Sequence, residues 1–339
     1  TREGNAIYAS RKVNALHIID NSVFENCGFG DGSVIVTKAL EFHFRNSRIE
    51  FGERLTNRKC RGITIGAIST TFISEAIFKY CNAPGAESKG GGLLLDKIEN
   101  IEGDQEEFEI DNAEFTGCTG ISGTAAYLCV NVNPTIRGLK ICEHEANISV
   151  NSFFQIESTI FQSNFILTDC TFYKNKFLNM GDEDGGGSGF KYTFAPSTGV
   201  DTAATITFQH CNWTRNIGYK GGAYSHSTNS LNIAFEDCTF EHNQVQKEGG
   251  TAGALYIHHT GEILIDNCTF YRNMCYGSST ESYGGGIVFD SACSSAIIRD
   301  TTFQRNQAIT GHAIYTKSSM STLRLESGCR FLDNSNGEI

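Results

Sequence analysis

The sequence predicts an all-β fold: a single-stranded, right-handed parallel β-helix, or solenoid, of about ten turns. Three observations predict it: a recurring aromatic-x-x-Asn motif, a glycine-led element that alternates with this motif, and the lack of any capped helical pattern. We expect one solenoid over residues 1–339, with degenerate repeats in 1–160 and regular repeats in 161–334.

The aromatic-x-x-Asn motif recurs six times, at intervals of 41, 27, 30, 33 and 28 residues. Its aromatic residues, which we call the anchors, are Phe172, Trp213, Phe240, Phe270, Phe303 and Phe331. Repeats of this length that hold two or three short strands are typical of solenoids, and stacking would bury the anchors as a continuous aromatic ladder. A propeller is the structural alternative, but a four-stranded blade usually needs a longer repeat.

A glycine-led element stands between successive anchors. Its clearest copies are residues 221–224, 253–256, 284–289 and 311–315. Glycine at the head of a strand permits a tight corner and a close backbone approach. In the repeat around Phe240 we also expect bends at Asp237 and Asn243, because Asn and Asp tolerate left-handed backbone angles.

Cysteine keeps a fixed place in the regular repeats, two residues before the anchor. These residues are Cys170, Cys211, Cys238, Cys268 and Cys329. Before residue 160 the equivalent aromatic residues, also called anchors, are Phe24, Phe78 and Phe115. There cysteine follows the anchor by three residues and replaces the Asn, as Cys27, Cys81 and Cys118. We interpret the first set as a column of buried thiols that pack as small apolar groups. Disulfides between adjacent turns are the alternative, because Cα atoms ~5 Å apart can be bridged.

Charge and composition limit the classes of partner. The chain has 27 Lys and Arg against 38 Asp and Glu, a formal net charge of -11, which argues against a nucleic-acid partner. No apolar run reaches the length of a membrane span in this segment. The chain begins at Thr1 without a signal segment and ends within the repeat pattern, so we expect a segment of a longer or processed protein.

Together, the Phe-x-x-Asn and Gly-Gly-Ala-[Ile/Leu/Tyr] elements resemble the repeats of the polymorphic outer-membrane protein passengers of chlamydiae. They are also similar to right-handed β-helix repeats of protist surface proteins. The matching repeats cover residues 160–334. The resemblance implies a parallel β-helix, an extracellular or cell-surface location, and an adhesive or structural role. It supplies no catalytic residue. The sequence departs from the family in its cysteine column, and we find no translocator domain within residues 1–339.

Few residues suggest a reactive or binding site. The acidic glycine-rich loop at 182–187 is interpreted as a solvated loop, with calcium binding as the alternative. His258 and His259 are weak metal candidates, and Glu106 and Glu107 are interpreted as surface charge. Sequons make Asn147, Asn212 and Asn267 candidates for glycosylation. Three tyrosines either stack sugars as a ladder or pack over the neighbouring turn: Tyr173, Tyr271 and Tyr276.

We predict no catalytic residue, no cofactor and no metal. The favoured function is a non-enzymatic extracellular structural or adhesive protein, part of a surface layer, appendage or filament. Its expected partners are further copies that stack head to tail, other surface proteins, or glycans. The alternative is a carbohydrate-active β-helix enzyme, such as a polysaccharide lyase or glycosidase. That alternative requires three or more acidic or basic side chains on one sheet face.

Overall fold

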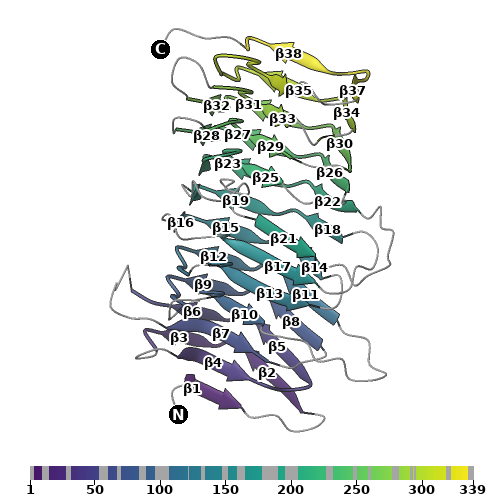
Figure 1. Ribbon diagram of the computed structural model, residues 1–339. Helices are drawn as coiled ribbons and strands as arrows, with labels where there is room; N and C mark the ends of the chain where they lie inside the picture. Colours follow the sequence, from purple (N-terminus) through teal and green to yellow (C-terminus); the bar gives the residue numbers. More distant parts are fainter. Residues whose placement is uncertain are drawn as a thin grey trace. The chain divides into compact units, whose positions relative to one another are not determined.

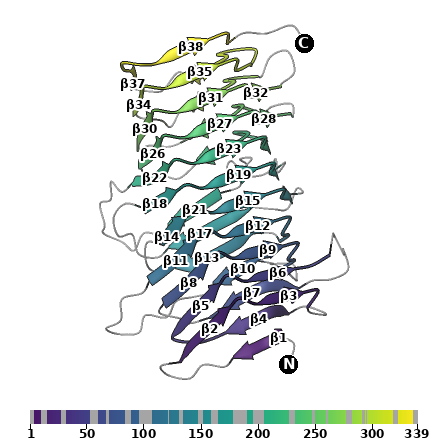
Figure 2. The same ribbon diagram turned by 180° about the vertical axis from the view of Figure 1, so that it is seen from behind.

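The computed structural model describes residues 4–9, 15–27, 32–52, 60–66, 70–83, 89–95, 107–120, 122–130, 134–146, 152–158, 165–177, 190–194, 205–226, 232–246, 250–258, 261–276, 282–290, 293, 295–317 and 322–334. In these residues every secondary-structure element longer than a turn is a β-strand. Each strand pairs in parallel with the equivalent strand of the next turn (Figure 1, Figure 2). The predicted all-β parallel solenoid is therefore confirmed.

The chain divides into two compact units. The N-terminal unit comprises Thr1–Glu145, Ser152–Gln162 and Lys191–Val200, and the C-terminal unit comprises Ala146–Asn151, Ser163–Phe190 and Asp201–Ile339. Both are solenoids, and their turns together come close to the predicted ten. The prediction that they form one solenoid stays a prediction.

Two sheets run through the N-terminal unit. We call the sheet whose strands contain the anchor positions the anchor sheet, and the sheet whose strands come just before them the entry sheet. The entry sheet holds β2 (Leu16–Asp20), β5 (Glu41–Arg45), β8 (Thr70–Ser74), β11 (Glu107–Asp111) and β14 (Thr135–Arg137). The anchor sheet holds β3 (Val23–Glu25), β6 (Arg48–Glu50), β9 (Ile77–Lys79), β12 (Glu114–Thr116) and β15 (Lys140–Cys142). A further sheet holds β1 (Gly4–Ala9), β4 (Ser33–Thr37), β7 (Arg61–Ile65), β10 (Leu93–Leu95), β13 (Ala126–Val130), β17 (Phe154–Ser158) and β21 (Phe190–Phe194). The short β16 covers Glu145–Ala146.

The C-terminal unit has the same two sheets. Its entry sheet holds β18 (Phe165–Thr168), β22 (Thr205–Gln209), β26 (Asn232–Glu236), β30 (Glu262–Asp266), β34 (Ser295–Arg299) and β37 (Thr322–Leu325). Its anchor sheet holds β19 (Thr171–Tyr173), β23 (Asn212–Thr214), β27 (Thr239–Glu241), β31 (Thr269–Tyr271), β35 (Thr302–Gln304) and β38 (Arg330–Leu332).

Two smaller sheets complete the turns of the C-terminal unit. One holds β20 (Lys176–Phe177), β24 (Ile217–Gly218), β28 (Gln244–Val245) and β32 (Met274–Cys275). The glycine sheet follows the glycine-led elements and holds β25 (Tyr224–His226), β29 (Leu255–Ile257), β33 (Ile287–Phe289) and β36 (Ile314–Thr316).

The anchors stack in register along the interior of the C-terminal unit. Ring centroids of successive anchors lie 4.6 to 5.1 Å apart and their planes are within 9° of parallel. This separation is close to the spacing of neighbouring strands, so each ring lies over its equivalent in the next turn. Five anchors are fully buried, whereas Phe331 stacks on Phe303 and is 47% exposed.

Close packing explains the glycines of the glycine-led element. Gly221 has a φ of 68°, a left-handed conformation that favours glycine. Gly253 lies against the next turn, where a Cβ atom would be 2.2 Å from the carbonyl oxygen of Gly285. A side chain at Gly253 would force the two turns apart.

One predicted bend is right and the other is wrong. Asp237, between β26 and β27, has a φ of 53° and forms what we call the first corner. At the second corner, after β27, the left-handed residue is His242, with a φ of 54°, and not Asn243. The Asn of the motif therefore has another role.

That role is a buried hydrogen-bond ladder along the second corner. Asn243 Nδ2 donates to the carbonyl oxygen of Trp213 at 2.9 Å and to Asn273 Oδ1 at 3.0 Å. Its own Oδ1 accepts from the backbone nitrogen and Nδ2 of Asn216, at 3.1 and 3.0 Å. The same pattern links Asn273, Asn306 and Asn334. The buried amides of Asn216, Asn243, Asn273 and Asn306 are thus fully hydrogen-bonded by their neighbours, as a buried polar group requires.

We predict that Asn243→Ala destabilises the C-terminal unit by about 3 kcal/mol or more, because it leaves buried groups of Asn216 and Trp213 without their partners. Asn212→Ala, at an exposed position one turn earlier, should change stability by less than about 0.5 kcal/mol. Urea unfolding followed by circular dichroism measures both. Equal effects of the two substitutions would show that the ladder adds no stability.

Candidate functional site

The predicted cysteine column lies at the first corner of the C-terminal unit. Cys170, Cys211, Cys238 and Cys268 are buried, and Cys329 is partly exposed in the last described turn. All five are free thiols.

These thiols act as hydrogen-bond donors across the corner. Cys238 Sγ donates to the carbonyl oxygens of Glu236 and Phe208, at 3.2 and 3.3 Å. Where Thr301 takes this position, its Oγ1 donates to the carbonyl oxygen of Arg299 at 2.8 Å. The position therefore holds a small side chain whose S–H or O–H group satisfies a carbonyl at the corner, beyond the apolar packing that the sequence indicated.

Burial also determines the chemistry of the column. It raises the pKa of Cys211, Cys238 and Cys268 well above that of a free thiol. The thiolate is the reactive form, so these groups have the properties of inert structural cysteines.

A second sulfur column replaces the Asn ladder in the N-terminal unit. Cys81 and Cys118 follow their anchors by three residues, and Cys118 Sγ donates to the carbonyl oxygen of Phe78 at 3.7 Å. His144 follows Ile141 of the anchor sheet at the same spacing. Burial raises the pKa of Cys81, whereas hydrogen bonds from Cys81 and His144 lower that of Cys118 against the opposing effect of burial. All three side chains are at most 1% exposed, so no substrate reaches them.

A buried carboxylate at the glycine sheet was missed by the sequence analysis. Asp290 is 5% exposed, and its Oδ2 atom accepts hydrogen bonds from the Tyr256 hydroxyl and from Lys317 Nζ, the latter at 2.7 Å. His258 Nδ1 lies 3.8 Å from the same oxygen. His258, Asp290 and Lys317 each follow a strand of the glycine sheet directly, which is the signal that could have identified them. The carboxylate of Asp290 is thus contacted by side chains from the turn before it and the turn after it.

The outer face of the N-terminal entry sheet carries the charges that an enzyme would need. A hollow of about 230 Å³ is lined by His43, Arg45, Phe72, Ile73, Ser74, Glu109 and Asp111. Arg137 Nε lies 3.0 Å from Asp111 Oδ1, and Arg137 Nη2 lies 3.9 Å from Glu109 Oε1. Both carboxylates of this hollow therefore lie beside one guanidinium from the next turn.

The remaining predicted sites do not converge. Tyr173 and Tyr271 are separated along the anchor sheet by Thr214 and Glu241, and their rings are covered by Lys174 and Arg272. A continuous sugar-stacking ladder is therefore absent from these positions. Tyr276 is 40% exposed.

The glycosylation candidates Asn212 and Asn267 are both exposed. Four predicted features lie outside the described residues: Glu106, Asn147, His259 and the loop at 182–187. Within the described ranges, no three His, Cys, Asp or Glu side chains form a metal-binding group. No helix long and apolar enough to cross a membrane occurs in that part of the chain either.

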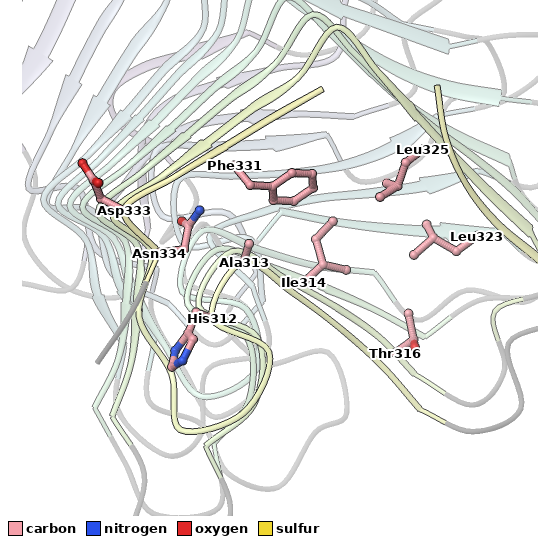
Figure 3. A pocket seen from close by; sticks show the side chains of 9 residues that line it. All are labelled: His312, Ala313, Ile314, Thr316, Leu323, Leu325, Phe331, Asp333 and Asn334. Carbon is pink, nitrogen blue, oxygen red and sulfur yellow. The ribbon is translucent and has the colours of Figure 1, made fainter. Parts of the chain in front are cut away.

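In the last described turn of the C-terminal unit, apolar side chains lie exposed at interior positions. Figure 3 shows the apolar side chains of Ile314, Leu323, Leu325 and Phe331 around one hollow of about 580 Å³. Leu325 and Phe331 are 49% and 47% exposed. Their register partners in the preceding turn, Ile298 and Phe303, are fully buried.

Comparison with known proteins gives no assignment. No protein family, no curated protein and no solved structure matches the chain.

We predict that iodoacetamide labels Cys27 and Cys329 in the native protein and does not label Cys211, Cys238 or Cys268 until the protein unfolds. The two groups should differ in labelling rate by roughly a hundredfold or more, because the buried thiols react only through opening of the fold. Peptide mass spectrometry measures the rates. A disulfide-linked peptide joining Cys211 to Cys238 in unreduced protein would contradict the free-thiol column.

Proposed function

We propose that the protein is a non-enzymatic structural or adhesive component of an extracellular or cell-surface layer, appendage or filament, in which copies stack head to tail. The observation that carries the proposal is the exposed edge of the last described turn of the C-terminal unit, which we call the open end. There β36, β37 and β38 form the edges of their sheets, and open strand edges pair readily with further strands.

Two features of the open end would fit a further turn stacked on it. Apolar side chains lie exposed at positions that are fully buried one turn earlier. The Asn ladder also ends there. The backbone nitrogen and Nδ2 of Asn306 both donate to Asn334 Oδ1, at 3.0 and 3.1 Å. Among the described residues, no further rung accepts from the equivalent groups of Asn334.

A second copy offers a matching surface. β2 and β3 are edge strands of the N-terminal unit, and Phe24 occupies the anchor position of β3. Phe24 is partly exposed, whereas its register partner Ile49 is fully buried. Placed on Phe331 of another copy, Phe24 would extend the aromatic ladder by one rung.

The resemblance of the repeats to chlamydial outer-membrane passengers and protist surface proteins also supports an extracellular adhesive role. The exposed sequon at Asn267 is compatible with a glycoprotein.

We predict that the protein forms end-to-end oligomers as its concentration rises, and that Leu325→Asp combined with Phe331→Asp weakens the association at least roughly tenfold. The introduced carboxylates would be buried without partners at the contact. Ile166→Asp is the matched control, because Ile166 is 44% exposed on β18 and lies away from the end. Sedimentation velocity and electron microscopy measure the assemblies.

A wild-type protein that stays monomeric at every concentration tested would overturn the stacking, as would equal weakening by Ile166→Asp. The charged hollow of the N-terminal unit defines the competing function, a carbohydrate-active enzyme. Cleavage of acidic or neutral polysaccharides that is lost in Glu109→Gln would establish that function instead.

A further inference from the structure

The second corner of the C-terminal unit presents a column of basic side chains. The residue before each ladder Asn is Lys174, Arg215, His242, Arg272 or Arg305 in five successive turns. We call these five residues the basic column. Each has a φ between 51° and 57°, and four of the five are exposed, with the His242 side chain 32% exposed.

Backbone hydrogen bonds hold the column in line. The backbone nitrogen of each member donates to a carbonyl oxygen of the next turn, at 2.9 to 3.0 Å. The Asn beside it is fixed by the buried ladder. Successive members are therefore separated by about one strand spacing, ~4.8 Å, and the five span about 20 Å.

The backbone does not require basic residues at this corner. In the N-terminal unit the left-handed residues at the equivalent corner are Asn26, Tyr80, Gly117 and Glu143. Left-handed backbone is easier for Gly or Asn than for Arg or Lys. The positive charge is thus a property of the C-terminal unit that its fold does not explain.

The first corner of the same turns has the opposite charge. Its left-handed residues are Asp169, His210, Asp237, Asn267 and Asp300. Two corners of identical conformation are therefore segregated by charge, in a chain whose net charge is -11. Such segregation is typical of a face that binds an anion.

Part of the basic column stays available to a ligand. Glu241 lies 3.5 Å from His242, and Asp333 lies 3.8 Å from Arg305 at the end of the column. Within the described residues, Arg215 and Arg272 form no ion pair. The guanidinium of Arg272 lies over the Tyr271 ring, 5.1 Å from its centroid, which holds it against the sheet.

A row of hydroxyl and amide groups lies on the same anchor sheet, three residues before the column along each strand. The outward-facing residues Tyr173, Thr214, Glu241, Tyr271 and Gln304 stand between the row and the column. The residues before the anchors point to the same outer face of the anchor sheet and align in register: Thr171, Asn212, Thr239, Thr269 and Thr302. None of the five is buried. These groups can exchange hydrogen bonds with neutral hydroxyls along the length of a ligand.

We propose that the basic column and this row bind one chain of a linear acidic polysaccharide, which runs along the column. A polyuronate or sulfated polysaccharide carries an anionic group on successive sugars, and one sugar is about as long as the strand spacing. Its hydroxyl groups complement the threonine row. Nucleic acid fits less well, because Lys174 and Arg272 cover the tyrosine rings on which bases would stack. The proposal does not depend on head-to-tail stacking.

The test measures binding of unglycosylated protein to heparin, polygalacturonate and neutral dextran by biolayer interferometry. Wild-type protein should bind one or both acidic polymers and not dextran, and its affinity should fall as salt rises. Arg215→Asn combined with Arg272→Asn should weaken binding at least roughly tenfold, because two of the four Lys and Arg contacts are lost. Asn suits the left-handed backbone, so thermal stability should be unchanged or higher and misfolding cannot explain the loss.

Arg299→Gln combined with Arg324→Gln is the control, since it removes the same charge from the outer face of the entry sheet. Its affinity should stay within about twofold of wild type. The proposal is overturned if neither acidic polymer binds, or if the control variant loses as much affinity as the column variant. Tighter binding of a single-stranded oligonucleotide than of either polysaccharide would also overturn it.

Discussion

Parallel stacking in register is the constraint on which the rest of the structure depends. Because each turn lies about 4.8 Å from the next, a side chain at any position meets its own equivalent above and below. Aromatic rings tolerate this and stack, as the anchors do. A buried polar group tolerates it only if it can both donate to and accept from a copy of itself, which the Asn amide does.

The same constraint explains what replaces Asn and what stands at the corners. Cysteine or threonine at the first corner donates to a carbonyl of its own turn, so it needs no matching acceptor on its neighbour. In the N-terminal unit Cys81, Cys118 and His144 occupy the ladder position with weaker but compatible hydrogen-bonding groups. At the exposed corners, stacking instead places charged side chains of successive turns in one column. One corner of the C-terminal unit becomes basic and the other acidic, and these outer columns give a uniform interior distinct binding faces.

Much of the fold could be predicted from one sequence, because a residue type that recurs at the same position of every repeat indicates the role of that position. The spacing of the anchors indicated the solenoid, and the glycine-led elements indicated close contacts between turns. The role of Asn243 was missed because a left-handed bend and a buried ladder both favour Asn, and sequence alone does not separate them. The basic column was missed because Arg and Lys carry no turn preference, and their conformation is imposed by the register. His258, Asp290 and Lys317 came together only once the ends of the glycine-sheet strands were known.

The central claim is that side-chain ladders, beyond the strand pairing, hold successive turns together. Amide hydrogen exchange at single-residue resolution tests it most directly, at the backbone nitrogens of Asn216, Asn243 and Asn273, which bond to side-chain oxygens of the next turn. The account predicts protection equal to that of the neighbouring strand amides of β23, β27 and β31. Exchange of these three amides at the rate of exposed loop residues, while the strands stay protected, would contradict it.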